Sequence, residues 1–139
     1  MINHVLDLQT LTVRQVMKPL EQAVAITTHT PVSAALASCR ERHLTRLPVW
    51  EERDGAPRIV GMLALNTLLY QPGLDVNKPV RDYMKPALFL AEDLRLEVAL
   101  QRLQRSGQRL AIVLSRERRE IGILSLQDVL KMVFGEVSL

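Results

Sequence analysis

Apolar residues form two patterns along the chain: the spacing of an amphipathic helix, and short continuous runs. Segments with the first pattern alternate with segments that carry the second. Three segments follow the i, i+3, i+4, i+7 order of an amphipathic helix, and a fourth, shorter one follows i, i+3, i+4. Four short apolar runs bounded by polar turn residues read as strands. The predicted helices cover residues 32–39, 65–69, 96–103 and 126–133, and the predicted strands cover 46–50, 59–63, 109–114 and 121–124. Thr30, which precedes Pro31, is predicted to cap the helix at 32–39, and Asp93 is predicted to cap the helix at 96–103.

The order of these elements repeats, and so does the segment that precedes them. Val13-Arg14-Gln15-Val16-Met17-Lys18-Pro19 recurs as Val80-Arg81-Asp82-Tyr83-Met84-Lys85-Pro86. Each half reads as strand, helix, strand, strand, helix. A unit of about 60 residues is too small to bury a sufficient core alone. We therefore expect residues 13–72 and 73–139 to form two repeats that pack together, with residues 1–12 as a linker.

Composition narrows the function classes. The net charge is +3, but the basic residues are spread along the chain and only 4% of residues are aromatic, which excludes a typical nucleic-acid-binding face. The single cysteine, Cys39, lies on a predicted buried stripe and excludes an internal disulfide or a multi-cysteine metal site. No apolar run is long enough to span a bilayer, so we expect this piece to be soluble.

Catalytic motifs are absent from the sequence. It contains no Gly-rich phosphate loop, no His-x-x-x-His pair and no Gly-x-Ser-x-Gly elbow. The three histidines, His4, His29 and His43, are far apart in the chain. We therefore expect no enzyme activity and no protein-held metal ion.

The doubled unit, with Met-Lys-Pro at its start and Gly-x-x-Ser-x-x-Asp at its end, resembles the CBS pair. The two ends of the chain, residues 1–17 and 130–137, are similar to those that flank the pair in CorC/HlyC-type magnesium and cobalt transporters. The resemblance implies an α/β (α+β) fold of two β-α-β-β-α repeats packed as a pseudo-twofold pair. It also implies a homodimer formed through CBS pairs, attached to the membrane domain of a parent chain and lying on the cytoplasmic side of the inner membrane.

The resemblance further implies an adenine nucleotide as ligand: AMP, ADP or ATP, with magnesium arriving as a counterion on the ATP phosphates. Asp128 would accept hydrogen bonds from the ribose hydroxyls, and Ser125 would contact a phosphate. The adenine wall and the phosphate charge would come from Lys85, Pro86, Ala87, Leu88, Arg109, Leu110 and Ala111. The aligned positions of the first repeat hold Ala64 and Thr67, so we expect one competent site.

Alternatives remain open from the residues alone. Ser125-x-x-Asp128 before an apolar run is also a helix-capping pattern. The turn at 115–120 departs from the family's usual acidic, tyrosine- and glycine-containing turn, and Arg109 stands where histidine is common, so the identity of the ligand is open. The chain could instead be a ligand-free dimerisation module, or a CBS insert of a metabolic enzyme.

Overall fold

The computed structural model describes residues 10–20 and 26–134 and divides the chain into two compact units. The middle unit lies between residues 22 and 87, and the terminal unit combines the segment before residue 22 with the chain from residue 88 onward. The stretches 1–9 and 135–137, which carry much of the resemblance at the chain ends, lie outside the described residues. Across the described ranges, no helix has the length and hydrophobicity of a membrane span.

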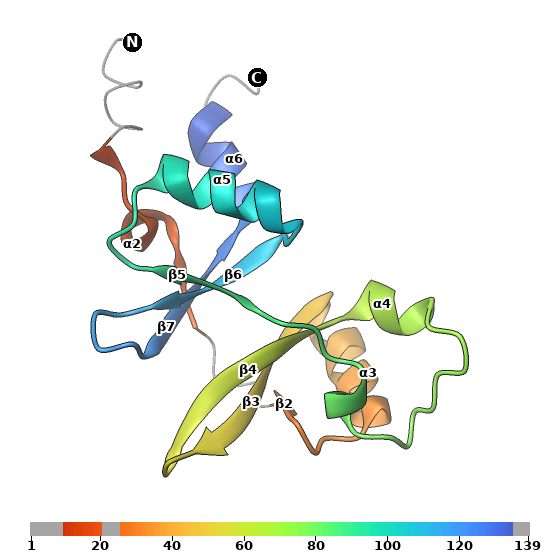
Figure 1. The fold of residues 1–139 in the computed structure, drawn as a ribbon. Helices are drawn as coiled ribbons and strands as arrows, with labels where there is room; N and C mark the ends of the chain where they lie inside the picture. The colour runs from red at the N-terminus through yellow and green to blue at the C-terminus, as the bar shows by residue number, and fades with distance from the viewer. Residues whose placement is uncertain (1–9, 21–25, 135–139) are drawn as a thin grey trace. The chain divides into compact units, whose positions relative to one another are not determined.

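The terminal unit is a four-stranded sheet covered by helices (Figure 1). Its strand order is β1-β7-β6-β5, with a parallel β5–β6 pair and antiparallel neighbours elsewhere. The elements are α2 (Val13–Val16), β1 (Lys18–Pro19), β5 (Leu88–Ala91), α5 (Leu96–Ser106), β6 (Leu110–Leu114), β7 (Glu120–Ser125) and α6 (Leu126–Phe134). Both longer helices, α5 and α6, pack on the sheet and on each other.

The middle unit is built on the same plan with a three-stranded sheet, order β2-β3-β4. Its elements are β2 (Ile26–Thr27), α3 (Val32–Arg42), β3 (Arg46–Arg53), β4 (Ala56–Ala64), α4 (Leu65–Leu69) and a 3₁₀ turn at Val80–Asp82. The hairpin strands are longer than predicted. Asp54 and Gly55 both have positive φ and form the tight turn. Pro57 lies within β4, because an edge strand tolerates a missing amide donor.

The predicted helix stripes form the core of each unit. Val32, Ala35 and Cys39 are buried in the middle unit, and Leu96, Ala99 and Leu103 in the terminal unit. These results confirm the 3.6-residue periodicity read from the sequence. Burial raises the pKa of the Cys39 thiol, because the thiolate loses its hydration there.

The predicted caps are wrong for α3 and α5. The N-cap residues are Pro31 and Arg95, and neither makes a side-chain capping bond. The Thr30 hydroxyl instead accepts the Thr27 amide at 3.0 Å. Distant backbone carbonyls satisfy the first helical amides: Lys78 and Val76 accept from Val32 and Ser33 at 2.9 Å each, and Leu11 accepts from Leu96 at 2.9 Å. Partners this remote in sequence cannot be read from a local pattern.

Each copy of the repeated segment, 13–19 and 80–86, packs against elements of the other sequence repeat. In the terminal unit, the amides of Val13 and Arg14 donate to Leu94 and Glu92, both at 2.9 Å. In the middle unit, the Val80 amide donates to Thr30 at 2.8 Å. We call residues 13–19 and 80–86 the exchanged segments. The sequence repeats and the compact units therefore divide the chain differently.

A glycine in each unit allows the exchanged segment to approach the sheet closely. A Cβ built on Gly122 would lie 2.6 Å from Met17 Sδ and 2.7 Å from the Lys18 carbonyl oxygen. In the middle unit, a Cβ on Gly61 would lie 2.9 Å from the Lys85 carbonyl oxygen. Both glycines are needed for steric reasons, because a side chain would occupy the path of the neighbouring backbone.

Candidate functional site

Ser125 is the last residue of β7, and its side chain caps helix α6. The Asp128 amide donates a hydrogen bond to Ser125 Oγ at 3.0 Å, and the Leu126 amide donates to the Arg109 carbonyl at 2.9 Å. The capping interpretation of the Ser-x-x-Asp pattern is thus confirmed. It does not exclude a ligand contact, because a hydroxyl that accepts one hydrogen bond can still donate its own hydrogen.

Asp128 lies in the first turn of α6, where the exposed amides of the helix favour a negative charge. Its side chain is 17% exposed, and its Oδ2 atom lies 3.6 Å from Nζ of Lys18, whose side chain is 68% exposed. Lys18 reaches this position because β1 pairs with β7, with Lys18 opposite Ile123. The exchanged segment therefore supplies a cationic neighbour to the carboxylate.

Three predicted apolar wall residues lie at the same end of this sheet. Leu110 is paired with Ser125 across β6 and β7, and Leu88 is paired with Ala111 across β5 and β6. Ala111 is buried, and the two leucines are half-buried. Arg109 precedes β6 and is exposed. The structure thus brings six of the predicted residues to one sheet end: Leu88, Arg109, Leu110, Ala111, Ser125 and Asp128.

Lys85, Pro86 and Ala87 belong to the middle unit. Lys85 forms a bridge with Met62 there, and the two residues exchange backbone hydrogen bonds of 2.8 Å in both directions. The cation that the structure brings to Asp128 is Lys18, which sequence reasoning missed. The two Met-Lys-Pro copies are identical, so the only signal that could have found Lys18 is knowledge of the exchange.

The equivalent position of the middle unit lacks the polar pair. Ala64 is the N-cap residue of α4 and makes no side-chain capping bond, and Thr67 stands where Asp128 stands in the other repeat. Helix α4 covers only Leu65–Leu69, whereas α6 covers Leu126–Phe134. Loss of the serine therefore coincides with a shorter helix, and this position offers no carboxylate to a ligand.

The opposite end of the terminal unit's sheet holds two cavities of about 640 and 490 Å³. Neither includes Ser125 or Asp128 in its lining. The Glu92 side chain is 14% exposed there: its Oε1 lies 3.6 Å from Nη1 of Arg14, and its Oε2 accepts the Arg116 amide at 3.1 Å. Glu92 therefore fastens the exchanged segment to the sheet end opposite Asp128.

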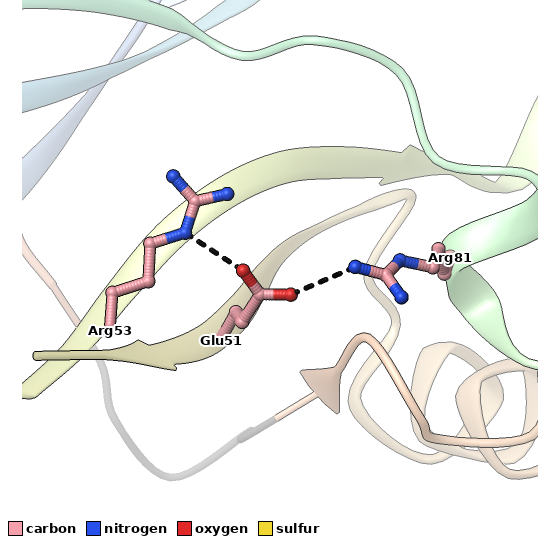
Figure 2. Close-up of polar contacts among 3 residues, drawn as sticks. All are labelled: Glu51, Arg53 and Arg81. Atoms are coloured by element: carbon pink, nitrogen blue, oxygen red, sulfur yellow. Dashed lines mark hydrogen bonds and ion pairs between the residues drawn. The ribbon is translucent and has the colours of Figure 1, made fainter. Parts of the chain in front are cut away.

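The middle unit fastens its exchanged segment in the same way. Figure 2 shows Arg81 and Arg53 approaching the Glu51 carboxylate from two sides, at 3.3 Å and 2.8 Å. The hydrogen bond from Arg53 is the main cause that holds the pKa of Glu51 below its usual range, and the charges of Arg53, Arg81 and His29 act in the same direction. Arg14 and Arg81 occupy equivalent positions of the repeat, so an arginine–glutamate pair stands at the beginning of each exchanged segment.

A pH titration tests this arrangement. We expect the Glu51 carboxyl to titrate below the ordinary glutamate range, because its ionised form is favoured in the folded protein. Its contribution to stability is present at neutral pH and is lost as the pH falls through the lowered pKa. Carboxyl NMR should show the pKa rising in Arg53→Gln, and rising less in Arg81→Gln. An unchanged pKa in Arg53→Gln would contradict the assignment of the main cause.

Metal ions in proteins are held chiefly by His, Cys, Asp and Glu side chains. Within residues 10–20 and 26–134, no three His, Cys, Asp or Glu side chains gather in a way that could hold a metal ion.

Comparisons with known proteins agree with this architecture. The family model described as CBS domain matches residues 13–71 and 80–135. A solved structure of the CBS domain of the bacterial CNNM/CorC family Mg²⁺ transporter in complex with ATP superposes with a TM-score of 0.83. It is 30% identical to this chain, and the match covers 97% of this chain and 95% of that one.

Two curated relatives are similar over nearly the whole chain. A UPF0053 protein of Mycobacterium bovis is 27% identical over 142 residues, which cover 99% of this chain and 32% of the relative. The magnesium and cobalt efflux protein CorC of Vibrio cholerae is 24% identical over 138 residues, which cover 99% of this chain and 47% of the relative. The chain thus spans a third to a half of the length of these relatives.

Proposed function

Because the chain belongs to the CBS domain family, as a tandem CBS pair of the CorC/CNNM type, we propose that it is a regulatory module that binds an adenine nucleotide. The observation that carries the proposal is the polar group at one end of the terminal unit's sheet: Ser125, Asp128 and Lys18. The ATP complex of the similar CBS structure supports the choice of ligand.

Each residue of this group has a chemical role in the proposal. The Asp128 carboxylate accepts hydrogen bonds from both ribose hydroxyls, and Ser125 donates its hydroxyl hydrogen to a phosphate oxygen. The amino-terminal end of α6 favours the negative phosphate, and the exposed Arg109 offsets its charge. Leu88, Leu110 and Ala111 form the apolar wall for adenine. The assignment of Lys85, Pro86 and Ala87 to the same ligand stays a prediction from the sequence.

The module would regulate a partner domain if the nucleotide binds its alternative arrangements with different affinities. A nucleotide that binds one arrangement of the module more tightly shifts the population toward that arrangement. A ligand at about 100 times its dissociation constant stabilises the bound state by about 2.7 kcal/mol, which is enough to bias a balanced equilibrium. We propose that the biased partner is the membrane domain of a magnesium or cobalt transporter, on its cytoplasmic side. Magnesium would enter with the ATP phosphates.

A thermal-melt titration tests the proposal. We expect AMP, ADP or ATP, with and without magnesium, to raise the melting temperature of the wild-type chain. The variant Asp128→Ala should lose this rise, because the ribose hydroxyls lose their acceptor. The ligand-free stability should change little, since the Lys18 partner of Asp128 is largely exposed and such ion pairs contribute about 0–1 kcal/mol.

The repeat supplies a matched control for this experiment. Thr67→Ala changes the equivalent position of the middle unit, and we expect it to keep the nucleotide-dependent rise. A rise that persists in Asp128→Ala would assign Asp128 to helix capping alone. No rise at millimolar nucleotide in the wild type would reject nucleotide binding.

A second function is favoured by a different observation. Large apolar side chains are exposed on the last helix of each unit: Leu69 of α4 is 63% exposed, and Phe134 of α6 is 58% exposed. Together with the absence of the polar pair at Ala64 and Thr67, this suits a dimerisation module without ligand. Sedimentation of the chain alone would support that function if it shows a dimer while the nucleotide titration shows no binding.

A further inference from the structure

We propose that Lys18 makes the Asp128 site select nucleotides over nucleosides, by pairing with the ribose-binding carboxylate in the free protein and with the ligand phosphate in the complex. This inference rests on the proposed function. It adds a residue that the sequence did not assign to the site, together with the ligand group that this residue recognises.

The backbone of the exchanged segment confines Lys18 to the neighbourhood of Asp128. Lys18 and Pro19 are paired with Ile123 and Gly122 of β7, and the adjoining Leu20 amide donates to Ile121 at 3.3 Å. The lysine therefore starts from a fixed strand position. Its exposed four-carbon stem leaves the ammonium free to turn between acceptors that lie a few ångströms apart.

Lys18 and Asp128 differ in solvent exposure, and this difference determines how the ion pair affects ligand binding. The Asp128 side chain is 17% exposed and the Lys18 side chain is 68% exposed, so the ammonium stands on the open side of the carboxylate. Ribose hydroxyls that approach Asp128 from solvent must share the carboxylate with Lys18 or displace the ammonium. A nucleoside offers no anion in return, whereas a nucleotide offers its phosphate as a new partner.

The repeat helps to separate this role from a purely structural one. Lys85 is the equivalent lysine of the second exchanged segment, and Thr67 stands where it would need a carboxylate partner. If the lysine only supported the docking of each segment, Lys18→Met and Lys85→Met would have similar effects. If Lys18 recognises phosphate, Lys18→Met changes the preference between nucleotide and nucleoside, whatever the effect of Lys85→Met.

Calorimetric titration of the whole chain with adenosine, AMP and ATP tests the inference. We expect Lys18→Met to weaken AMP and ATP binding about tenfold, a change of about 1.4 kcal/mol. Adenosine binding should stay within about twofold, or tighten, because no phosphate contact is lost and Asp128 becomes more accessible. Lys18→Arg should retain most of the AMP affinity, and Lys18→Glu should reverse the preference for AMP over adenosine. Lys78→Met, which removes an exposed lysine of the middle unit, controls for the loss of one positive charge.

The outcomes distinguish this inference from the proposed function. If the wild type binds AMP and Lys18→Met keeps the wild-type ratio of AMP to adenosine affinity, the inference is overturned and nucleotide binding stands. If Lys85→Met changes the ratio and Lys18→Met does not, the phosphate cation is Lys85 and the inference is again overturned. If the wild type binds none of the three ligands, the proposed function itself fails. Should Lys18→Met not fold, the Lys18→Arg and Lys18→Glu pair still decides the sign of the charge effect.

Discussion

Replacing Gly122 by alanine is expected to lower the free energy of unfolding by about 1–3 kcal/mol, the usual cost of overpacking a close contact. The added Cβ would meet Met17 Sδ and the Lys18 carbonyl oxygen at 2.6 Å and 2.7 Å, and a carbonyl in a paired strand cannot turn away as a side chain can. The exchanged segment must therefore shift, and Lys18 shifts with it. Urea denaturation should show the loss of stability, and hydrogen exchange should show reduced protection of the Leu20 amide, which donates to Ile121.

Gly61→Ala is the matched change in the middle unit. Its nearest atoms, the Lys85 carbonyl oxygen and Met84 Sδ, lie at 2.9 Å and 3.0 Å, so a smaller loss of stability is expected. Gly122→Ala should also weaken nucleotide binding, because its added Cβ would contact the backbone of Lys18. Gly61→Ala should not, because its added Cβ would contact Lys85 instead. Wild-type stability together with an unchanged exchange rate at Leu20 would show that the segment does not need this close approach.

Replacing Leu103 by alanine should give the largest loss of stability, about 2–5 kcal/mol, because deleting a buried side chain leaves a cavity as well as losing burial. Leu103 is fully buried in α5 and belongs to the core of the terminal unit, together with Leu90 and Leu124. Denaturant midpoints of the purified variants measure this effect.

Gln101→Ala is the control on the same helix. Gln101 is exposed, so its replacement should change the free energy of unfolding by no more than about 0.5 kcal/mol. Equal losses in the two variants would mean that α5 does not pack on the sheet through Leu103.

In the proposed function, a bound nucleotide acts on the parent chain through the exchanged segment of the terminal unit. The exchanged segment Val13–Pro19 leads from the arginine–glutamate pair at one sheet end to Lys18 at the other. It is also the described part of the chain that connects to residues nearer the amino terminus. A ligand that draws Lys18 away from Asp128 acts directly on that segment, and this is the differential contact that a population shift requires.

Much of the local structure could be predicted from the sequence, because it depends on neighbours within a few residues. The helical stripes are buried as the periodicity requires, and Asp54-Gly55 forms the hairpin turn. The Ser125 cap on Asp128 also follows from spacing alone. Duplication of the unit, and the loss of the polar pair at Ala64 and Thr67, are visible in the chain itself.

The sequence by itself thus determined the four helices α3 to α6, the four hairpin strands, the repeat, and the hydroxyl and carboxylate at the start of α6. Only the tertiary structure decided which Met-Lys-Pro segment lies beside them, and which carbonyls satisfy the first amides of α3 and α5. Two identical motifs have the same local energetics, so the choice between Lys18 and Lys85 cannot come from either motif. Long-range strand pairing places Lys18 beside Asp128, through contacts between residues about a hundred positions apart, such as Lys18 and Ile123.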